Sequence, residues 1–384
     1  METNQELSEL DKLLIHFSNQ GGSDLFITAG RPATMKKDKE LINLTDSKLT
    51  PGMCIDLCTQ LMNAEQIEEF QRTQECNFAY HILKVARYRV NVFIQRGTPG
   101  MVIRSVKTEI PDLETLRLPP ILKKLIMEKN GLILIVGSTG SGKSTTLASL
   151  VDIRNQVREG HIITIEDPIE FMHSHKKSIV TQREVGVDTV NYETALKNTL
   201  RQAPDVILIG EIRSRETMEH ALAFAETGHL CLSTLHANNT NQTLDRIINF
   251  FPPDDRNHIL MDLSLNLKAV VSQRLLPKIG GGLIAAVEVL IATPRISELI
   301  FQGNISEIKE VMKKSNALGM QTFDQALFEL YESGLVTYQD ALRAADSSND
   351  LRLDIKLNSK LSAPEEVLIE NASSASSFSL KQEE

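Results

Sequence analysis

The chain has 384 residues, of which 41% are hydrophobic and 24% are charged, and its formal net charge is -9. This length accommodates two domains of ordinary size, and this composition is that of a soluble globular protein rather than a disordered or fibrous one. The acidic balance disfavours a protein that holds a nucleic-acid backbone over a wide surface, although it is compatible with a local basic patch.

The first residues are acidic, whereas a secretory signal would begin with basic residues followed by an apolar run. No apolar run that matters to the fold approaches the ~20 residues that span a bilayer. We therefore expect a cytoplasmic protein that contacts a membrane only through a partner.

Residues 1–110 are predicted to form a small α+β domain. Apolar residues recur at helical spacing over residues 6–17, and a further helical stretch is expected around residues 56–70. Strands are expected over residues 24–28, 87–93 and 101–106. Prolines in residues 111–120 favour an extended linker after this domain.

Residues 121–357 are predicted to form an α/β domain with a parallel sheet. Short apolar strands over residues 132–136, 162–165, 206–209 and 230–234 are each followed by helical sequence, which is typical of crossover connections. Beyond residue 255 we expect mostly helix, with one further strand over residues 284–291. The small polar residues of 358–384 predict a disordered tail.

Four cysteines are scattered along the chain without the spacing of a zinc site. We expect them to pack in the core as small apolar residues. They are Cys54, Cys58, Cys76 and Cys231.

A phosphate-binding loop is predicted directly after the strand over residues 132–136. The sequence G-S-T-G-S-G-K-S fits the pattern G-x-x-x-x-G-K-[ST], and the strand before it and the helix after it are the context that the motif requires. Backbone N–H groups would close around the phosphates of ATP, Lys143 would reach the β and γ oxygens, and Ser144 would bind Mg²⁺. The residues expected to bind the nucleotide are Gly137, Ser138, Thr139, Gly140, Ser141, Gly142, Lys143, Ser144 and Thr145.

Two carboxylates are expected at the carboxyl edge of the sheet, where α/β folds bind their ligands. Glu170 follows the strand over residues 162–165, and Glu211 follows the strand over residues 206–209. Phosphoryl transfer needs a metal and an oriented water, so a metal ligand and a general base are the expected roles. Solvated acids at strand ends are the alternative that the residues alone leave open.

Two histidines bracket the strand over residues 230–234. His229 and His236 could face the γ-phosphate or a neighbouring subunit, whereas a single histidine is more often a satisfied polar residue. Their spacing alone does not decide between these interpretations.

Several segments resemble one known family. Residues 200–213, L-R-Q-A-P-D-V-I-L-I-G-E-I-R, resemble the signature of the secretion ATPases that drive type II secretion and type IV pili. Residues 164–170 resemble the Asp box of that family, and residues 226–236 resemble its His box. The sequences G-G-S-D at 21–24 and A-R-Y-R-V-N at 86–91 are also similar, so the resemblance extends to about residue 357. It implies a RecA-like P-loop domain preceded by a small PAS-like domain, in a hexameric ring that couples ATP hydrolysis to mechanical work.

The resemblance also implies roles for individual residues. Glu170 matches the catalytic base, Glu211 matches the Walker B acid that acts at Mg²⁺, and His229 and His236 match the His-box residues near the phosphate and the subunit boundary. The family uses arginines of the small domain near the nucleotide. The nearest candidates here are Arg87, Arg89 and Arg104.

Within the family, the chain is similar to the retraction branch, because it has neither the additional amino-terminal domain nor the four-cysteine zinc module of the assembly and secretion members. Residues 215–221, 230–237 and 344–353 resemble the accessory retraction ATPases of that branch. Ser214 stands where the family signature usually has an aspartate, and T-P-R-I-S-E-L-I at 293–300 replaces the motif A-I-R-N-L-I-R-E of the main retraction ATPases. The second difference favours an accessory role in pilus retraction and twitching motility.

The partners that this resemblance implies are further copies of the chain in a hexamer, a PilT-like retraction ATPase and a PilC-like platform protein of the inner membrane. The expected location is the inner face of the cytoplasmic membrane, without direct insertion and without nucleic acid.

Two other hypotheses remain open. A ring-forming nucleic-acid translocase of P-loop type would be stimulated by single-stranded DNA, and a regulatory nucleotide-binding module would lack hydrolysis, which the complete set of acids disfavours.

Overall fold

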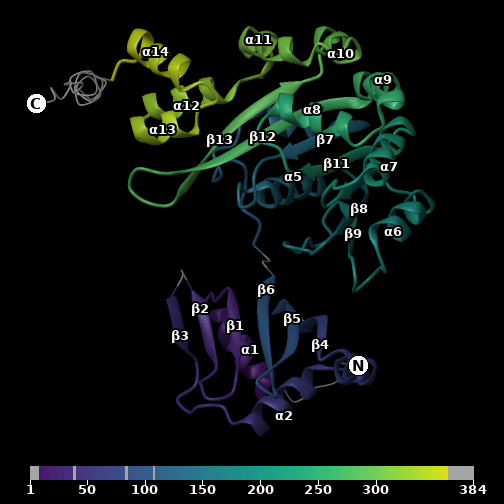
Figure 1. The fold of residues 1–384 in the computed structure, drawn as a ribbon, viewed down its shortest axis with the longest axis vertical. Helices are drawn as coiled ribbons and strands as arrows, with labels where there is room; N and C mark the ends of the chain where they lie inside the picture. Colours follow the sequence, from purple (N-terminus) through teal and green to yellow (C-terminus); the bar gives the residue numbers. More distant parts are fainter. Residues whose placement is uncertain (1–7, 38–39, 83–84, 107–108, 362–384) are drawn as a thin grey trace, which may run out of the picture. The chain divides into compact units, whose positions relative to one another are not determined.

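The computed structural model describes residues 8–37, 40–82, 85–106 and 109–361. These residues form two compact units (Figure 1). The first unit contains the chain up to Ile110 together with Glu166–Ser174 and Gln182–Asn191. The second contains Pro111–Ile165, His175–Thr181 and the chain from Tyr192 onward. Most of the tail that the sequence predicts to be disordered lies outside the described residues.

The first unit is built on a six-stranded antiparallel sheet in the order β3-β2-β1-β6-β5-β4. The expected strands over residues 24–28, 87–93 and 101–106 are confirmed as β1, β5 and β6. The other three were not predicted; β2 and β3 are short and carry polar residues, whereas β4 alternates the buried Cys76, Phe78 and Ile82 with less buried neighbours. The bounds are β1 Asp24–Ile27, β2 Thr34–Lys37, β3 Glu40–Asn43, β4 Glu75–Ile82, β5 Ala86–Gln95 and β6 Thr98–Val106.

Three helices accompany this sheet: α1 Glu9–Asn19, α2 Pro51–Leu61 and α3 Ala64–Thr73. The helical stretch expected around residues 56–70 is found, but as parts of two helices, because α2 ends at Leu61 and α3 begins at Ala64. Asn63 caps the amino end of α3, where its side chain accepts from the backbone N–H of Gln66 while the Gln66 side chain accepts from that of Asn63. This reciprocal pair starts a helix and interrupts the preceding one.

The cysteines pack as the sequence predicts. Cys54 and Cys58 are buried on one face of α2, and Cys76 and Cys231 are buried in strands. Burial raises the pKa of the Cys58 thiol to about 12, with a further contribution from Cys54. These side chains are therefore neutral thiols of the core at physiological pH.

The second unit contains a seven-stranded sheet in the order β13-β12-β7-β11-β10-β8-β9. The strands β12, β7, β11, β10 and β8 pair in parallel in that order, and β13 pairs antiparallel with β12. Every residue of β7, β10 and β11 is buried, as expected of strands covered on both faces. The predicted RecA-like parallel α/β fold is confirmed. The bounds are β7 Gly131–Val136, β8 Gly160–Glu166, β9 Ser178–Glu184, β10 Val206–Ile209, β11 Leu230–Leu235, β12 Leu267–Pro277 and β13 Leu283–Ile291.

The expectation of mostly helical sequence beyond residue 255 missed β12. This strand follows a helix without a turn of glycine or proline, since α9 ends at Asn266 and β12 begins at Leu267, so no local signal separates the two elements. The helices of the second unit are α4 Ile121–Leu125, α5 Lys143–Val157, α6 Tyr192–Thr199, α7 Arg215–Glu226, α8 Thr240–Asn249, α9 Arg256–Asn266, α10 Pro294–Phe301, α11 Ile308–Lys313, α12 Phe323–Glu332, α13 Tyr338–Ala344 and α14 Ser348–Asn358. Figure 1 shows α12, α13 and α14 grouped beside the hairpin of β12 and β13.

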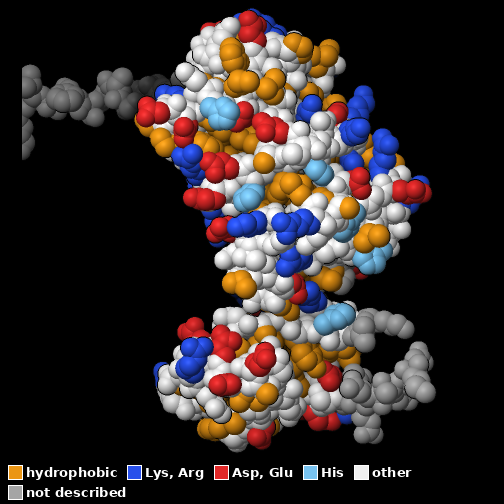
Figure 2. Space-filling view, turned by 90° about the vertical axis from the view of Figure 1, so that its right-hand side faces the viewer, with side chains coloured by type: hydrophobic (Ala, Val, Ile, Leu, Met, Phe, Trp, Pro, Cys, Tyr) orange, Lys and Arg blue, Asp and Glu red, His pale blue; other side chains and the backbone are white. Residues whose placement is uncertain are grey.

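The surface carries charges of both signs. On the face drawn in Figure 2, Lys and Arg side chains form small groups among acidic ones, and the apolar side chains are scattered. Within the described part of the chain, no helix combines the length and the apolar character needed to cross a bilayer.

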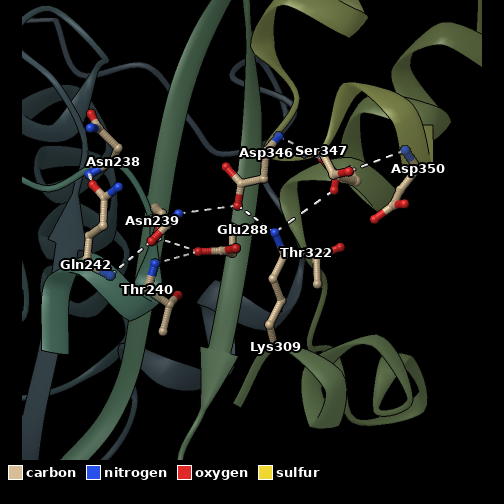
Figure 3. A network of polar contacts seen from close by, with 12 residues as sticks. Asn238, Asn239, Thr240, Gln242, Glu288, Lys309, Thr322, Asp346, Ser347 and Asp350 are labelled. Carbon is tan, nitrogen blue, oxygen red and sulfur yellow. Dashed lines mark hydrogen bonds and ion pairs between the residues drawn. The ribbon is translucent and has the colours of Figure 1, made fainter. Parts of the chain in front are cut away.

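A buried carboxylate joins α8 to the sheet. Glu288 of β13 is 2% exposed, and its Oε1 accepts from the backbone N–H of Thr240 at 2.7 Å and from the hydroxyl of Ser272 at 3.1 Å. Figure 3 shows Glu288 beside the start of α8, with Asp346 close to it. Burial raises the pKa of Glu288, and Asp346 adds to this effect although the hydrogen bonds oppose it.

We expect Glu288→Gln to remove a pH dependence from the stability of the fold. Because the pKa is raised in the folded state, the stability that Glu288 contributes is present below its unfolded pKa and is lost as the pH rises above that value. As the pH rises above the unfolded pKa, the melting temperature of the wild type should fall relative to that of the glutamine variant. Glu288→Ala should instead be less stable throughout, by about 1–3 kcal/mol, because the N–H of Thr240 loses its acceptor. Parallel pH curves for wild type and Glu288→Gln would contradict this prediction.

Candidate functional site

The phosphate-binding loop connects the central strand β7 to α5. Gly137, Gly140 and Gly142 have φ angles of 153°, 78° and 89°, in the region that residues with a Cβ rarely adopt. Gly142 is the residue before α5 and no side chain caps the helix there. The first backbone N–H groups of α5 therefore remain available to an anion.

Lys143 lies across this loop. Its Nζ donates to the carbonyl oxygens of Gly137 at 2.9 Å and Ser138 at 2.8 Å, and the residue is 9% exposed. The ammonium group is thus held within the loop itself, at the place where the motif predicts contact with phosphate.

A cavity of about 270 Å³ adjoins the loop. Ser141, Gly142 and Thr145 form its polar side, and residues of the linker and of the β12–β13 hairpin form the other side. Small-molecule sites combine apolar walls with a few polar groups in this way. The apolar lining includes Leu116, Leu118, Leu275 and Ile284.

Glu211 and His236 meet at the carboxyl edge of the sheet. The β10 strand pairs with β11, and Glu211 and His236 follow these strands. Oε1 of Glu211 lies 3.2 Å from Nε2 of His236, and Oε2 accepts from Nε of Arg213 at 2.7 Å. The hydroxyl of Thr234 donates to the carbonyl of Gly210 at 2.6 Å, which ties the two strand ends together.

His229 lies at the opposite edge of this sheet. It precedes β11, and its carbonyl accepts from the backbone N–H of Gly131, the first residue of β7. The six residues of β11 separate it from the edge with His236, a distance of roughly 20 Å at the rise of a strand. The two histidines of the predicted site are therefore not brought together.

Glu170 belongs to the first unit, with Glu166–Ser174. Its side chain is exposed, whereas the preceding Ile169 is buried. The carboxylate of Glu184 accepts from the backbone N–H of Ile169 at 3.4 Å, and Gln182 donates to the carbonyl of Phe171 at 2.9 Å. The end of β9 thus fixes the segment that carries Glu170.

The three candidate arginines are all ion-paired. Glu184, which is 3% exposed, lies 3.5 Å from Arg87 and 3.3 Å from Arg89. Arg104 contacts Asp24 at 2.8 Å. Sequence reasoning missed Glu184, although it falls on the same inward-facing positions of β9 as Ser178 and Val180, and an acid there requires a buried partner.

Among the residues that the structure describes, no three His, Cys, Asp or Glu side chains are grouped so as to hold a metal ion by themselves. Magnesium commonly takes only one or two protein carboxylates and completes its shell with phosphates and water. The hydroxyl of Ser144 and the carboxylate of Glu211 are donors of the kind that such an ion accepts.

Together, the parallel sheet, the glycine-rich loop after β7 and the acid after β10, at the same edge of the sheet, define a P-loop nucleotide-hydrolysing protein. Residues 4–283 match the family described as type II/IV secretion system protein, and the chain belongs to this family. The family predicted from the sequence is confirmed.

Individual relatives agree with this assignment. The chain is 56% identical to the type IV pilus ATPase PilU of Pseudomonas aeruginosa over 92% of its own length and 93% of the relative. It is 39% identical to the type IV pilus retraction ATPase PilT of the same organism, over 88% and 98%. Among solved structures, the pilus retraction motor PilT with bound ADP matches with a TM-score of 0.84 and 42% identity, over 91% of this chain and 100% of that one. The higher identity to PilU agrees with the expected accessory branch.

We expect Gly137→Ala to destabilise the loop far more than Gly140→Ala. A Cβ at Gly137 would lie 2.6 Å from the carbonyl oxygen of Gln273, whereas a Cβ at Gly140 would meet nothing within 4 Å. Alanine would also have to adopt a φ of 153° at position 137 and of 78° at position 140, so the difference combines the clash with the greater backbone strain at position 137. Thermal unfolding without nucleotide would measure it. Equal melting temperatures for the two variants would contradict the prediction.

Proposed function

We propose that the chain is the ATP-hydrolysing subunit of a hexameric motor of the type IV pilus machinery, with a PilU-like accessory role in retraction and twitching motility. The observation that carries this proposal is that the phosphate-binding loop, His236 and Glu211 follow the parallel strands β7, β11 and β10 at the same edge of the sheet, where Glu211 contacts His236. The relatives named above support the pilus assignment, since PilU and PilT are type IV pilus ATPases.

In this proposal the nucleotide phosphates bind the loop from Gly137 to Thr145, and the base enters the neighbouring cavity of about 270 Å³. Lys143 exchanges its carbonyl partners for the β and γ oxygens. Ser144 and Glu211 would hold Mg²⁺, which would neutralise charge on the phosphates.

Glu170 is proposed as the general base, because it is exposed while the backbone beside it is fixed. His236 is proposed to lie near the phosphates of the nucleotide, beside Glu211, which its ring contacts at 3.2 Å. Since His229 lies at the other edge of the sheet, its proposed role is confined to the subunit boundary. Arg87 or Arg89 is the proposed arginine of the small domain: one of the two leaves Glu184 to contact nucleotide, while the other keeps its ion pair with Glu184.

The proposed partners are five further copies of the chain, a PilT-like retraction ATPase and a PilC-like platform protein at the inner face of the cytoplasmic membrane.

A nucleic-acid translocase is not favoured. The net charge of -9 and the interspersed charges of Figure 2 oppose wide contact with a phosphate backbone. Single-stranded DNA should therefore leave the ATPase rate unchanged.

We expect Lys143→Ala to reduce ATP turnover by ~10²-fold or more, because a cation that stabilises developing charge is removed. Steady-state phosphate release measures this change. Light scattering and thermal unfolding serve as controls, since the variant should still form the ring and should still fold. Retention of more than about a tenth of wild-type turnover would contradict the proposed phosphate contact.

Glu170→Gln and Glu211→Gln should differ although both remove one carboxylate. If Glu170 accepts the proton of the attacking water, its variant should bind ATP and Mg²⁺ normally while hydrolysis falls by ~10²–10⁴-fold. Glu211→Gln should additionally require more Mg²⁺, because a hard cation prefers charged oxygen. Titration of Mg²⁺ and ATP against binding and turnover separates the two. Normal hydrolysis in Glu170→Gln would exclude it as the base, and an unchanged Mg²⁺ requirement in Glu211→Gln would leave Glu211 with a structural role.

A further inference from the structure

Two consecutive residues of β12 connect the phosphate-binding loop to the carboxyl-terminal helices. Gln273 donates from Nε2 to the hydroxyl of Thr146 in α5 at 2.9 Å, and its side chain is almost fully buried. Arg274, the next residue, lines a cavity of about 600 Å³ together with Ser138 of the loop. A single strand therefore contacts the nucleotide-binding helix through one residue and the cavity beside it through the next.

Arg274 joins two segments that are far apart in the sequence. Its Nη2 donates to the carbonyl of Asn238 at 3.0 Å, and its Nη1 donates to the carbonyl of Ala344 at 2.5 Å. The guanidinium also pairs with Asp346 at 2.5 Å and lies 3.9 Å above the ring of Phe323. A planar guanidinium with several fixed donors can make all of these contacts at once, which a lysine cannot.

Asp346 is itself held from several sides. Its carboxylate accepts from Lys309 at 2.8 Å and from the side chain of Asn239 at 3.3 Å, and its backbone N–H donates to Asp324 at 2.8 Å. Figure 3 shows Asp346 between Asn239 and Lys309. Although burial acts to raise the pKa of Asp346, the hydrogen bonds and charges of Lys309 and Arg274 lower it. The carboxylate is therefore an ionised anchor for Arg274.

The segment that Arg274 holds carries a residue of the candidate site. Asn238 lies two residues after His236, whose ring contacts Glu211 at 3.2 Å. Between His236 and the start of α8, the chain is tied to the C-terminal helices by Arg274 at Asn238 and by Asp346 at Asn239. The residues that follow His236 are therefore tied to the far end of the chain.

We propose that Arg274 is a positioning residue that, anchored on Asp346 and the carboxyl-terminal helices, sets the loop carrying His236 against Glu211. This inference rests on the proposed ATPase function and adds a residue to it. This arrangement would also let α11–α14 influence hydrolysis, because displacement of these helices would displace Asp346 and, with it, Arg274.

The first test uses Arg274→Met, which keeps an unbranched side chain and removes the donors. We expect kcat for ATP to fall by about 10- to 100-fold, since a small displacement of a reacting group has effects of this size. KM for ATP should stay within about twofold, because the phosphate-binding loop is not changed. Arg343→Met is the matched control: Arg343 lines the same cavity, but its side chain is 77% exposed and it pairs with Asp340 of its own helix at 3.9 Å. It should have wild-type kinetics.

A double-mutant cycle with His236→Gln distinguishes positioning from a general structural role. If Arg274 acts through His236, the double variant should have the kcat of His236→Gln alone. Multiplied effects, or a wild-type kcat in Arg274→Met, would overturn the proposal. Wild-type kcat in His236→Gln would overturn it as well, while leaving ATP hydrolysis at the P-loop intact.

Hydrogen exchange without nucleotide tests the same inference independently of turnover. The amides of residues 236–240 should exchange faster in Arg274→Met and in the milder Asp346→Asn, but not in Arg343→Met. Unchanged exchange in both variants would overturn the proposal even if the wild type hydrolysed no ATP, a result that would separately contradict the proposed function. Should Arg274→Met fail to fold, Asp346→Asn and Arg274→Lys carry both measurements.

Discussion

The parallel register of β7, β11 and β10 is the constraint on which the candidate site depends. Val136 pairs with Leu235, and Ile209 pairs with Ser233, so the three strands end at one edge of the sheet. The chain leaves β7 into the phosphate-binding loop, β11 into His236 and β10 towards Glu211. Because the strands are buried on both faces, a shift of any one of them would disrupt packing on two sides. The core thereby fixes the placement of the phosphate-binding loop relative to Glu211 and His236, which lie far along the sequence from it.

Internal partners hold the cationic side chains that the sequence predicted near the nucleotide. Lys143 donates to two carbonyls of its own loop, Arg87 and Arg89 contact Glu184, and Arg104 contacts Asp24. Phosphate must compete with these contacts, so the free energy of nucleotide binding is a difference between two sets of charge-assisted hydrogen bonds. The competition is strongest at Glu184, because a buried carboxylate that loses its cations is costly. Glu184 is therefore expected to keep at least one of its arginines during the reaction.

The sequence predicted the parts of the structure whose signals are local. Residues 132–144 combine an apolar strand, a glycine-rich loop and a helix start, and the structure shows all three. The boundary between α2 and α3 was also encoded locally, in the pair Asn63 and Gln66, but the apolar periodicity on both sides obscured it. The strand β12 lacked a turn signal at its start, and only its pairing with β7 and β13 defines it.

The long-range contacts could not be predicted in this way. The assignment of Glu170 to the first unit follows from contacts with β9, and the separation of His229 from His236 follows from the length and direction of β11. Motif spacing gives the residue types of a site but not the edge of the sheet at which each one lies. The same limitation applies to Glu184 and Arg274, which belong to no short motif and gain their significance from partners far along the chain.

The polar network around Asp346 is explained better by geometry than by stability. Removing two charges from water costs several kcal/mol per ion, and their attraction often does no more than offset that cost. A well-packed apolar cluster at this place would serve the fold equally well. An apolar cluster would not fix polar groups at defined positions. The donors of Arg274 hold the carbonyls of Asn238 and Ala344 in place, and Asp346 holds the guanidinium. A network that specifies positions next to a phosphate-binding loop is therefore suited to align a reacting group, and its stabilising contribution is secondary.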